Sequence, residues 1–181
     1  MERIFFGLLL ALAFASDLEA QTTFYQGKTI TLVAGTSAGS QYDAHARLIA
    51  QHWGKHIAGN PDFIVQNMPG AGSLIAANHL YNVAKPDGLT ITSIIPAIYF
   101  NQLAGRKEVW FDYSKFNWIG SVDRSDNVIY MRSDTPFKTI YDVRRAAPPP
   151  KCTATGTGTI GHYMPKLLNE TIGTKFDIIL G

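Results

Sequence analysis

The 181-residue chain has a single cysteine, Cys152, and only 17% of its residues are charged. One cysteine excludes an internal disulfide and leaves the redox compartment open. The formal net charge is +2, and the basic residues are scattered along the chain. This excludes the concentrated basic surface that is typical of a nucleic-acid-binding protein. Because 46% of the residues are hydrophobic, the composition is that of a globular protein.

Catalytic and metal-binding motifs are scarce as well. The sequence contains neither H-E-x-x-H nor G-x-S-x-G, which mark zinc peptidases and serine hydrolases. His45, His52 and His56 fall on one expected helix, but no third ligand completes a metal site, so we interpret them as a solvated face. Cys152 lies in an apolar segment without a neighbouring base, which favours a small core residue over a nucleophile. The residues alone therefore provide no clear catalytic constellation and no metal site.

No apolar run approaches the roughly 20 residues of a membrane span, but a shorter run stands near the N-terminus. A short charged start, Met1–Arg3, precedes the apolar residues 4–15, and small residues follow. This order is typical of a secretory signal peptide. We expect residues 1–20 to be removed after Ala20, with cleavage after Ala15 as the alternative and an N-terminal core helix as the competing interpretation. The processed chain would keep 15 basic against 11 acidic residues, which weakly suits an anionic ligand.

Strand and helix signals alternate along the first half of the remaining chain. Runs of β-branched and aliphatic residues predict strands, apolar residues at helical spacing predict helices, and glycine- and proline-rich turns separate them. This β-α-β-α-β order predicts a parallel sheet covered by helices. The expected strands are 29–34, 63–65 and 89–95, and the expected helices are 41–56, with Ser40 as N-cap, and 73–83.

The second half of the chain begins with an aromatic stretch over residues 99–118. Packing against the sheet is the simpler interpretation of these rings, and a ring that lines a ligand cleft is the alternative. Pro148–Pro150 forbid helix and predict a stiff connection. The expected strands here are 118–122, 128–131, 151–155 and 176–180, and the expected helices are 139–146, capped by Thr139, and 159–172.

This order divides the chain into a first α/β lobe at 21–122 and a crossover with the start of a second lobe at 123–181. The last expected strand is followed only by Gly181, so no helix covers it. We therefore expect the second lobe to be truncated. Residues 21–181 alone would then bind a ligand poorly and fold only in part.

Two strand–loop–helix junctions carry glycines and hydroxyls where a helix begins, at 35–43 and at 156–162. Free backbone N–H groups and the helix dipole prepare such a place for an anion such as a carboxylate. Helix capping without a ligand is an equally good interpretation of either loop alone. The second loop also spells G-x-G-x-x-G, and Asp177 lies near the acidic position of a dinucleotide fingerprint. An NAD- or FAD-dependent enzyme fragment therefore remains an alternative.

Four ordered motifs resemble those of one known family. Lys28–Val33, a glycine loop that ends in Asp43, and Ala46–Leu48 resemble the start of the tripartite tricarboxylate transporter substrate-binding family, also called Bug receptors. Asn67–Gly72 is similar to that family's Asn-Arg-Pro-Gly-Ala-Gly turn. Its next two hallmarks are similar to Ala84–Thr90 and to Thr155–His162. The resemblance covers residues 24–181.

The resemblance implies a periplasmic-binding-protein-like fold, in which two α/β lobes with parallel-rich sheets close on an organic acid. It also implies a monomeric periplasmic receptor that delivers a small carboxylate to membrane permease subunits, with no nucleic acid involved. Such a receptor is a binding protein and not an enzyme, and we expect no metal and no cofactor. A gene fragment without function is a further alternative. The ligand-binding residues carried over from the family are Ser37, Ala38, Gly39, Asp43, Gly158, Thr159, Ile160, Gly161 and His162.

The sequence departs from the family pattern at both predicted binding loops. Ser37-Ala38 stand where prolines are usual, and Ile160-Gly161 stand where two serines are usual. Met68 replaces the arginine of the second turn, and the family's chain continues past Gly181. These changes keep the backbone donors but remove hydroxyls, which puts the family's usual ligand in question.

Overall fold

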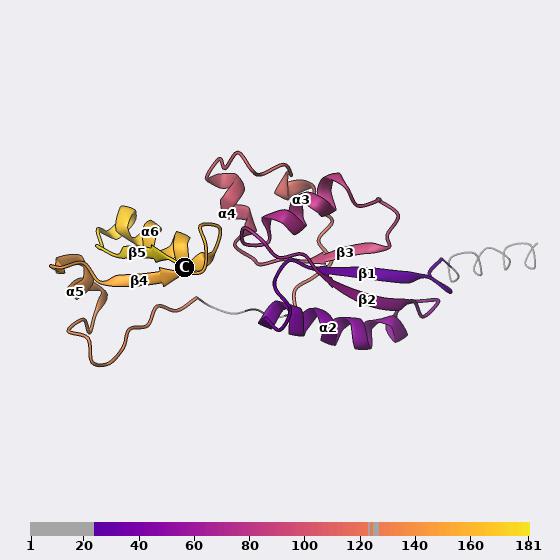
Figure 1. Ribbon diagram of the computed structural model, residues 1–181, viewed down its shortest axis with the longest axis horizontal. Coiled ribbons are helices and arrows are strands. Elements are labelled where there is room, and N and C mark those ends of the chain that lie inside the picture. Colours follow the sequence, from indigo (N-terminus) through magenta and orange to yellow (C-terminus); the bar gives the residue numbers. More distant parts are fainter. Residues whose placement is uncertain (1–23, 123, 125–126) are drawn as a thin grey trace, which may run out of the picture.

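The computed structural model describes residues 24–122, 124 and 127–181, and the predicted signal peptide lies outside them. The chain forms an α/β structure with two separate parallel sheets, as the sequence predicted (Figure 1). We call the larger part, around β1–β3, the three-stranded unit, and the part around β4 and β5 the two-stranded unit. None of the helices within the described residues is both long and apolar enough to cross a bilayer.

The three-stranded unit is built on a sheet with the strand order β2-β1-β3. β1 (Thr29–Ala34) is central, β2 (Asp62–Asn67) pairs with it on one side and β3 (Thr90–Ser93) on the other, all parallel. Helix α2 (Gln41–Trp53), which continues as the 3-10 turn η1 (Gly54–His56), covers one face. Helix α3 (Leu74–Asn82) lies on the opposite face (Figure 1). These elements confirm the predicted alternation, with boundaries that differ by at most two or three residues.

Apolar side chains form a separate core on each face of this sheet. On the α2 face, Leu32 and Ala34 pack with Ala46 of the helix. On the other face, Leu74 and Ala77 of α3 pack with Ile98 and Phe111. Burial of each large apolar side chain stabilises the fold by about 1.5–3 kcal/mol. These contacts therefore hold the helices against the sheet.

The aromatic stretch forms two short helices that the sequence analysis did not predict, α4 (Ile98–Leu103) and the 3-10 helix η2 (Tyr113–Lys115). Most of its rings pack on one another. Phe116, for example, contacts Phe111, Tyr113 and Trp118 with ring centroids 5.4–6.5 Å apart. These rings therefore pack together, in contacts that are favourable for aromatic pairs. That one of the rings lines a ligand cleft stays a prediction.

The predicted strands 118–122 and 128–131 are wrong. The described residues of both segments are irregular and almost all exposed, including Val128 at 77% and Tyr130 at 88%. Their β-branched and aromatic content does favour strands. A strand also needs a hydrogen-bonding neighbour, however, and the described residues of these two segments pair with no strand of either described sheet.

The two-stranded unit pairs β4 (Lys151–Ala154) in parallel with β5 (Asp177–Leu180). Helix α6 (Ile160–Ile172) connects these strands and packs on both of them. The short helix α5 (Ile140–Arg145) precedes them and begins with the predicted cap, because Thr139 and Asp142 form a reciprocal capping box. The strand–helix–strand order predicted for this segment is confirmed.

Candidate functional site

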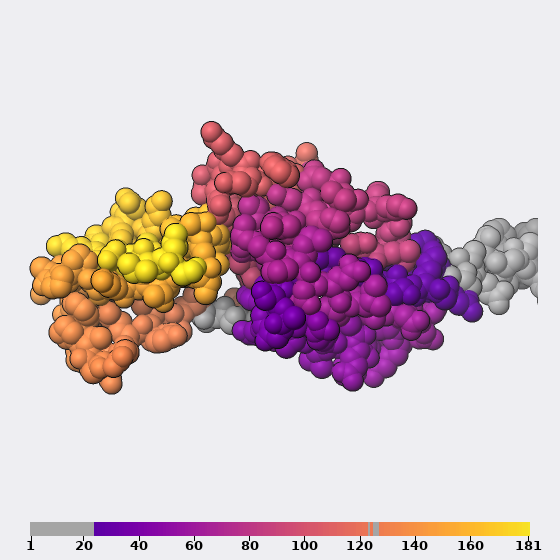
Figure 2. Space-filling model, in the orientation of Figure 1, coloured from indigo at the N-terminus to yellow at the C-terminus, as the bar shows by residue number. Residues whose placement is uncertain are grey.

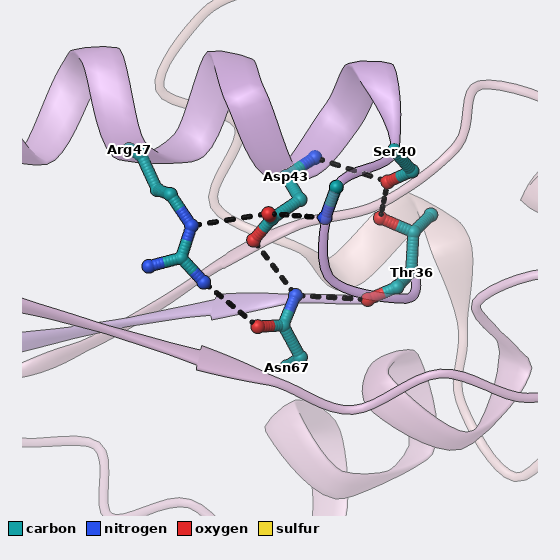
Figure 3. A network of polar contacts seen from close by, with 6 residues as sticks. Thr36, Ser40, Asp43, Arg47 and Asn67 are labelled. Carbon is teal, nitrogen blue, oxygen red and sulfur yellow. Dashed lines mark hydrogen bonds and ion pairs between the residues drawn. The ribbon is translucent and has the colours of Figure 1, made fainter.

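The loop between β1 and α2 is held by a network of charged and polar side chains (Figure 3). Ser40 caps α2 as predicted, because its hydroxyl accepts a hydrogen bond of 3.2 Å from the Asp43 N–H. The Asp43 carboxylate accepts hydrogen bonds from the Gly39 N–H at 2.8 Å and from Arg47 Nε at 3.0 Å. Its second oxygen accepts one from Asn67 Nδ2 at 2.8 Å. The network therefore joins the loop, the helix and the end of β2.

Asp43 is buried, with 2% of its surface exposed, and it is surrounded by donors. Hydrogen bonds from Arg47, Asn67 and the Gly39 N–H, in that order, lower the pKa of Asp43 from 3.8 to about 2. The carboxylate is thus ionised at neutral pH and is directed at protein groups. In this arrangement Asp43 fixes the shape of the loop, while Ser37, Ala38 and Gly39 are exposed at its surface.

The turn between β2 and α3 has an unusual backbone. Gly70, Ala71, Gly72 and Ser73 all have positive φ angles, of 137°, 46°, 63° and 66°. The left-handed region suits glycine but is strained for Ala71 and Ser73. Ser73 is buried, and its hydroxyl donates to the Gly35 carbonyl at 2.9 Å and accepts from the Ile95 N–H at 3.2 Å. This one side chain ties the turn to the ends of β1 and β3.

The glycine–threonine loop of the two-stranded unit leads into α6 and leaves the start of that helix uncapped by a side chain. The Thr159 hydroxyl donates back to the Gly156 carbonyl at 2.8 Å and not to the helix. Among the described residues, the N–H groups of Ile160 and Gly161 have no acceptor. Two donors and the positive end of the helix dipole therefore meet at this point.

His162 follows in the first turn of α6. Its Nδ1 atom is buried and has no hydrogen-bond partner among the described residues. Burial, followed by the nearby charges of Lys166 and Arg106, lowers the pKa of His162, so its ring is neutral at pH 7. A neutral imidazole can donate or accept one hydrogen bond at that nitrogen.

The glycine–threonine loop rests on the three-stranded unit, and Figure 2 shows the two units in contact. The backbones approach closely, because a Cβ added to Gly158 would lie 2.9 Å from the Ala71 carbonyl oxygen. Arg106 Nη1 donates to the Thr157 hydroxyl at 3.2 Å, and the Tyr163 hydroxyl donates to Asn101 Oδ1 at 3.2 Å. Hydrogen bonds and close backbone contacts thus join the units beside the start of α6.

The structure gathers the predicted ligand-binding residues into two groups. In the first group, the Gly39 N–H is hydrogen-bonded to the Asp43 carboxylate. The second group, residues 158–162, leads into and begins α6. No hydrogen bond between described residues joins the two groups, because the second loop contacts Ala71 and Gly72 instead. Direct ligand contact by any of these nine residues stays a prediction.

Sequence reasoning missed Asn101 and Arg106, which lie next to the glycine–threonine loop. Asn101 is fully buried although it is polar, and it follows the apolar residues Ile98–Phe100 of α4. A polar residue within an apolar helical turn was the signal available, since buried amides require partners.

The other candidates noted in the sequence do not form a site within the described residues. No group of three or more histidine, cysteine or acidic side chains there could hold a metal ion, and His52 and His56 are exposed as expected. Cys152 is half-buried, and burial, with a smaller effect of Asp177, raises the pKa of its thiol. This supports its interpretation as a packing residue and not a nucleophile.

Residues 45–179 match the pattern of the family described as "Tripartite tricarboxylate transporter family receptor". The chain is 30% identical over 170 residues to the "UPF0065 protein in gbd 5'region" of Cupriavidus necator, covering 91% of this chain and 50% of the relative. It is 28% identical over 167 residues to the "UPF0065 protein in the TAR-I ttuE-ttuC' intergenic region" of Agrobacterium vitis, covering 86% and 45%. The chain thus spans about half the length of these curated relatives.

Proposed function

Because the chain belongs to the tripartite tricarboxylate transporter receptor family, we propose that it captures a small carboxylate and passes it to the membrane permease of such a transporter. Members of this family are binding proteins and not enzymes, so the dinucleotide alternative for the G-x-G-x-x-G loop is set aside. The glycines have another use in this structure, since Gly158 lets the loop approach the Ala71 carbonyl.

The observation that carries this proposal is the open start of α6. The N–H groups of Ile160 and Gly161 have no acceptor among the described residues, and no side chain caps the helix. One carboxylate could accept hydrogen bonds from both N–H groups and be stabilised by the helix dipole. The neutral His162 ring lies in the same turn and offers a further partner at Nδ1.

The start of α2 supports a different role for the first loop. There Ser40 and Asp43 already occupy backbone donors, and a second carboxylate beside Asp43 would meet its negative charge. We propose that the exposed residues Ser37, Ala38 and Gly39 face the ligand and offer it the Ser37 hydroxyl, while the Gly39 N–H stays bonded to Asp43. Asp43 would act on the ligand indirectly, by holding this segment in place.

Replacement of Ile160 by proline tests the carboxylate site. Proline removes the Ile160 N–H but fits the first helical position, and the preceding Thr159 has the extended backbone that proline requires, with φ −104° and ψ 160°. Loss of one hydrogen bond to a charged ligand costs roughly 1.5–3 kcal/mol. We expect Ile160→Pro to weaken binding of the best carboxylate by about 10- to 150-fold. Isothermal titration calorimetry with mono-, di- and tricarboxylates would measure the change.

The matched control is Ile160→Val, which changes the side chain but keeps the N–H. It should bind within about twofold of the parent. Equal affinity of the proline and valine variants would remove the start of α6 from the site. Absence of carboxylate binding across the whole panel by a version that carries a complete second lobe would contradict the proposed function itself.

We also propose that residues 1–20 direct export to the periplasm, the compartment in which receptors of this family act, and that 21–122 and 123–181 belong to the first and second lobes of the receptor. The two separate sheets, each with its own helices, support this division. Mass spectrometry of periplasmic protein should find Gln21 or Ser16 as the first residue. A cytoplasmic product that keeps Met1 would contradict the export proposal.

A further inference from the structure

We infer that Asn101 is a positioning residue that holds the glycine–threonine loop against the three-stranded unit. Its amide oxygen accepts hydrogen bonds from both units at once. Arg106 Nη1 of the three-stranded unit donates to it at 3.1 Å, and the Tyr163 hydroxyl of α6 donates at 3.2 Å. We call Asn101, Arg106, Thr157 and Tyr163 the clasp.

Burial makes this shared oxygen an important contact. Asn101 is 0% exposed, and its amide nitrogen donates to the Ile98 carbonyl within α4 at 3.4 Å. That bond fixes which side of the amide points toward the two-stranded unit. If the Tyr163 hydroxyl were removed while the units stayed docked, this buried acceptor would lose one of its two donors, which is unfavourable.

Two further contacts join the clasp residues across the two units. Arg106 Nη1 also donates to the Thr157 hydroxyl at 3.2 Å, so one guanidinium nitrogen connects Asn101 with the loop itself. The Tyr163 ring lies 5.4 Å from the Phe100 ring of α4, at an interplanar angle of 32°. Phe100 is thus the one ring of the aromatic stretch that meets the two-stranded unit among the described contacts.

The clasp lies directly beside the proposed carboxylate site without occupying it. Thr157 precedes, and Tyr163 follows, the open N–H groups of Ile160 and Gly161. The clasp therefore sets how far the start of α6 stands from the three-stranded unit before any ligand arrives. Where affinity is concerned, the inference rests on the proposed function; the docking of the two units does not depend on it.

The distance between the units tests the clasp without a ligand. Spin labels at His52→Cys on α2 and Glu170→Cys on α6, both exposed positions, would report it in a Cys152→Ser background. Tyr163→Phe removes the bonding hydroxyl but keeps the ring that faces Phe100. In this variant we expect double electron–electron resonance to show a second, longer distance between the labels. The ratio of docked to separated molecules should be about fivefold lower than in the parent.

The matched control is Tyr141→Phe, which removes the hydroxyl of a tyrosine that is 58% exposed and lies on α5. It should leave the distance distribution unchanged. Thr157→Val, at an exposed position, should shift the distribution in the same direction as Tyr163→Phe because it removes the acceptor for Arg106. Both clasp variants should keep the parent's urea midpoint, measured by tryptophan fluorescence. A lower midpoint in both variants would indicate a merely structural role and contradict the inference.

The outcomes separate the clasp from the ligand site. Unchanged distances in both Tyr163→Phe and Thr157→Val would overturn the inference, whatever the affinity for carboxylates. A changed distance, together with no carboxylate binding by a version that carries a complete second lobe, would support the clasp and contradict the proposed function. If the clasp and the proposed function are both correct, the carboxylate affinity of the clasp variants should fall in proportion to the loss of docked molecules.

Discussion

Ser73 offers the most direct test of how the three-stranded unit holds its loops. Its buried hydroxyl bridges the Gly35 carbonyl and the Ile95 N–H, and its backbone has a positive φ of 66°. Ser73→Ala removes both hydrogen bonds and keeps the strained backbone. Ser73→Gly removes the same bonds and relieves the strain. Comparison of the two variants therefore separates the hydrogen bonds from the backbone conformation.

The expected magnitude follows from the burial of the two partners. An unsatisfied buried group costs about 1–3 kcal/mol, and Gly35 is buried while Ile95 is half-buried and can reach water more easily. We expect Ser73→Ala to lower the free energy of unfolding by about 2–4 kcal/mol. A left-handed conformation costs a residue other than glycine about 1 kcal/mol, so Ser73→Gly should be more stable than Ser73→Ala by that amount.

Urea unfolding followed by tryptophan fluorescence is the suitable assay. Trp53, Trp110 and Trp118 all lie before residue 123, so the signal reports the three-stranded unit. Ser37→Ala, at an exposed position of the same unit, is the control for the loss of a serine hydroxyl. The reasoning fails if Ser73→Ala and Ser37→Ala unfold at the same urea concentration. Equal stability of the alanine and glycine variants would refute the argument from backbone strain.

Three further predictions concern the charge network, the sheets and the contact between the units. The pKa of Asp43 is lowered from 3.8 to about 2, so its bonds stabilise the fold above about pH 4 and are lost toward pH 2; Asp43→Asn should flatten this fall in the urea midpoint. Amides 30–34 should exchange with deuterium more slowly than 152–155, because β1 has two neighbouring strands and β4 has one, and equal protection would contradict this. Gly72→Ala would place a Cβ 2.9 Å from the Gly158 carbonyl oxygen and should increase the radius of gyration measured by small-angle X-ray scattering. The control Gly105→Ala has the same φ of 63° but open space around it, so it should leave the radius of gyration unchanged.

The sequence predicted the regular elements where local signals agree with the tertiary contacts. The β-branched run at 29–34 becomes β1 with the predicted bounds, and Ser40 and Thr139 cap the helices that they were expected to cap. Residues 118–122 and 128–131 have similar composition but lack a neighbouring strand. Strand propensity describes a segment, whereas pairing depends on the rest of the chain, so the same signal succeeded in one place and failed in the other.

The candidate site shows the same limit. The glycine loops were found from the sequence, because glycines and hydroxyls before a helix form a local pattern. The roles of Asp43 and Asn101 were not, since each depends on residues distant in sequence. Asn67 lies 24 positions from Asp43, and Tyr163 lies 62 positions from Asn101. Motif reading identified Asp43 as important but could not say whether its carboxylate points at a ligand or at the protein.

The Asn67 side chain also has a consequence for how the chain folds. In the parallel pair of β1 and β2, Asn67 stands opposite Ala34, the last residue of β1. Its amide reaches both Asp43 and the Thr36 carbonyl from this position. A slip of the pairing by one residue would turn the side chains of β2 to the opposite face of the sheet and put Gln66 or Met68 at the place of Asn67. The buried Asp43 carboxylate would then lose a donor. The hydrogen bond between Asn67 and Asp43 therefore favours the native strand register over one shifted by a single residue.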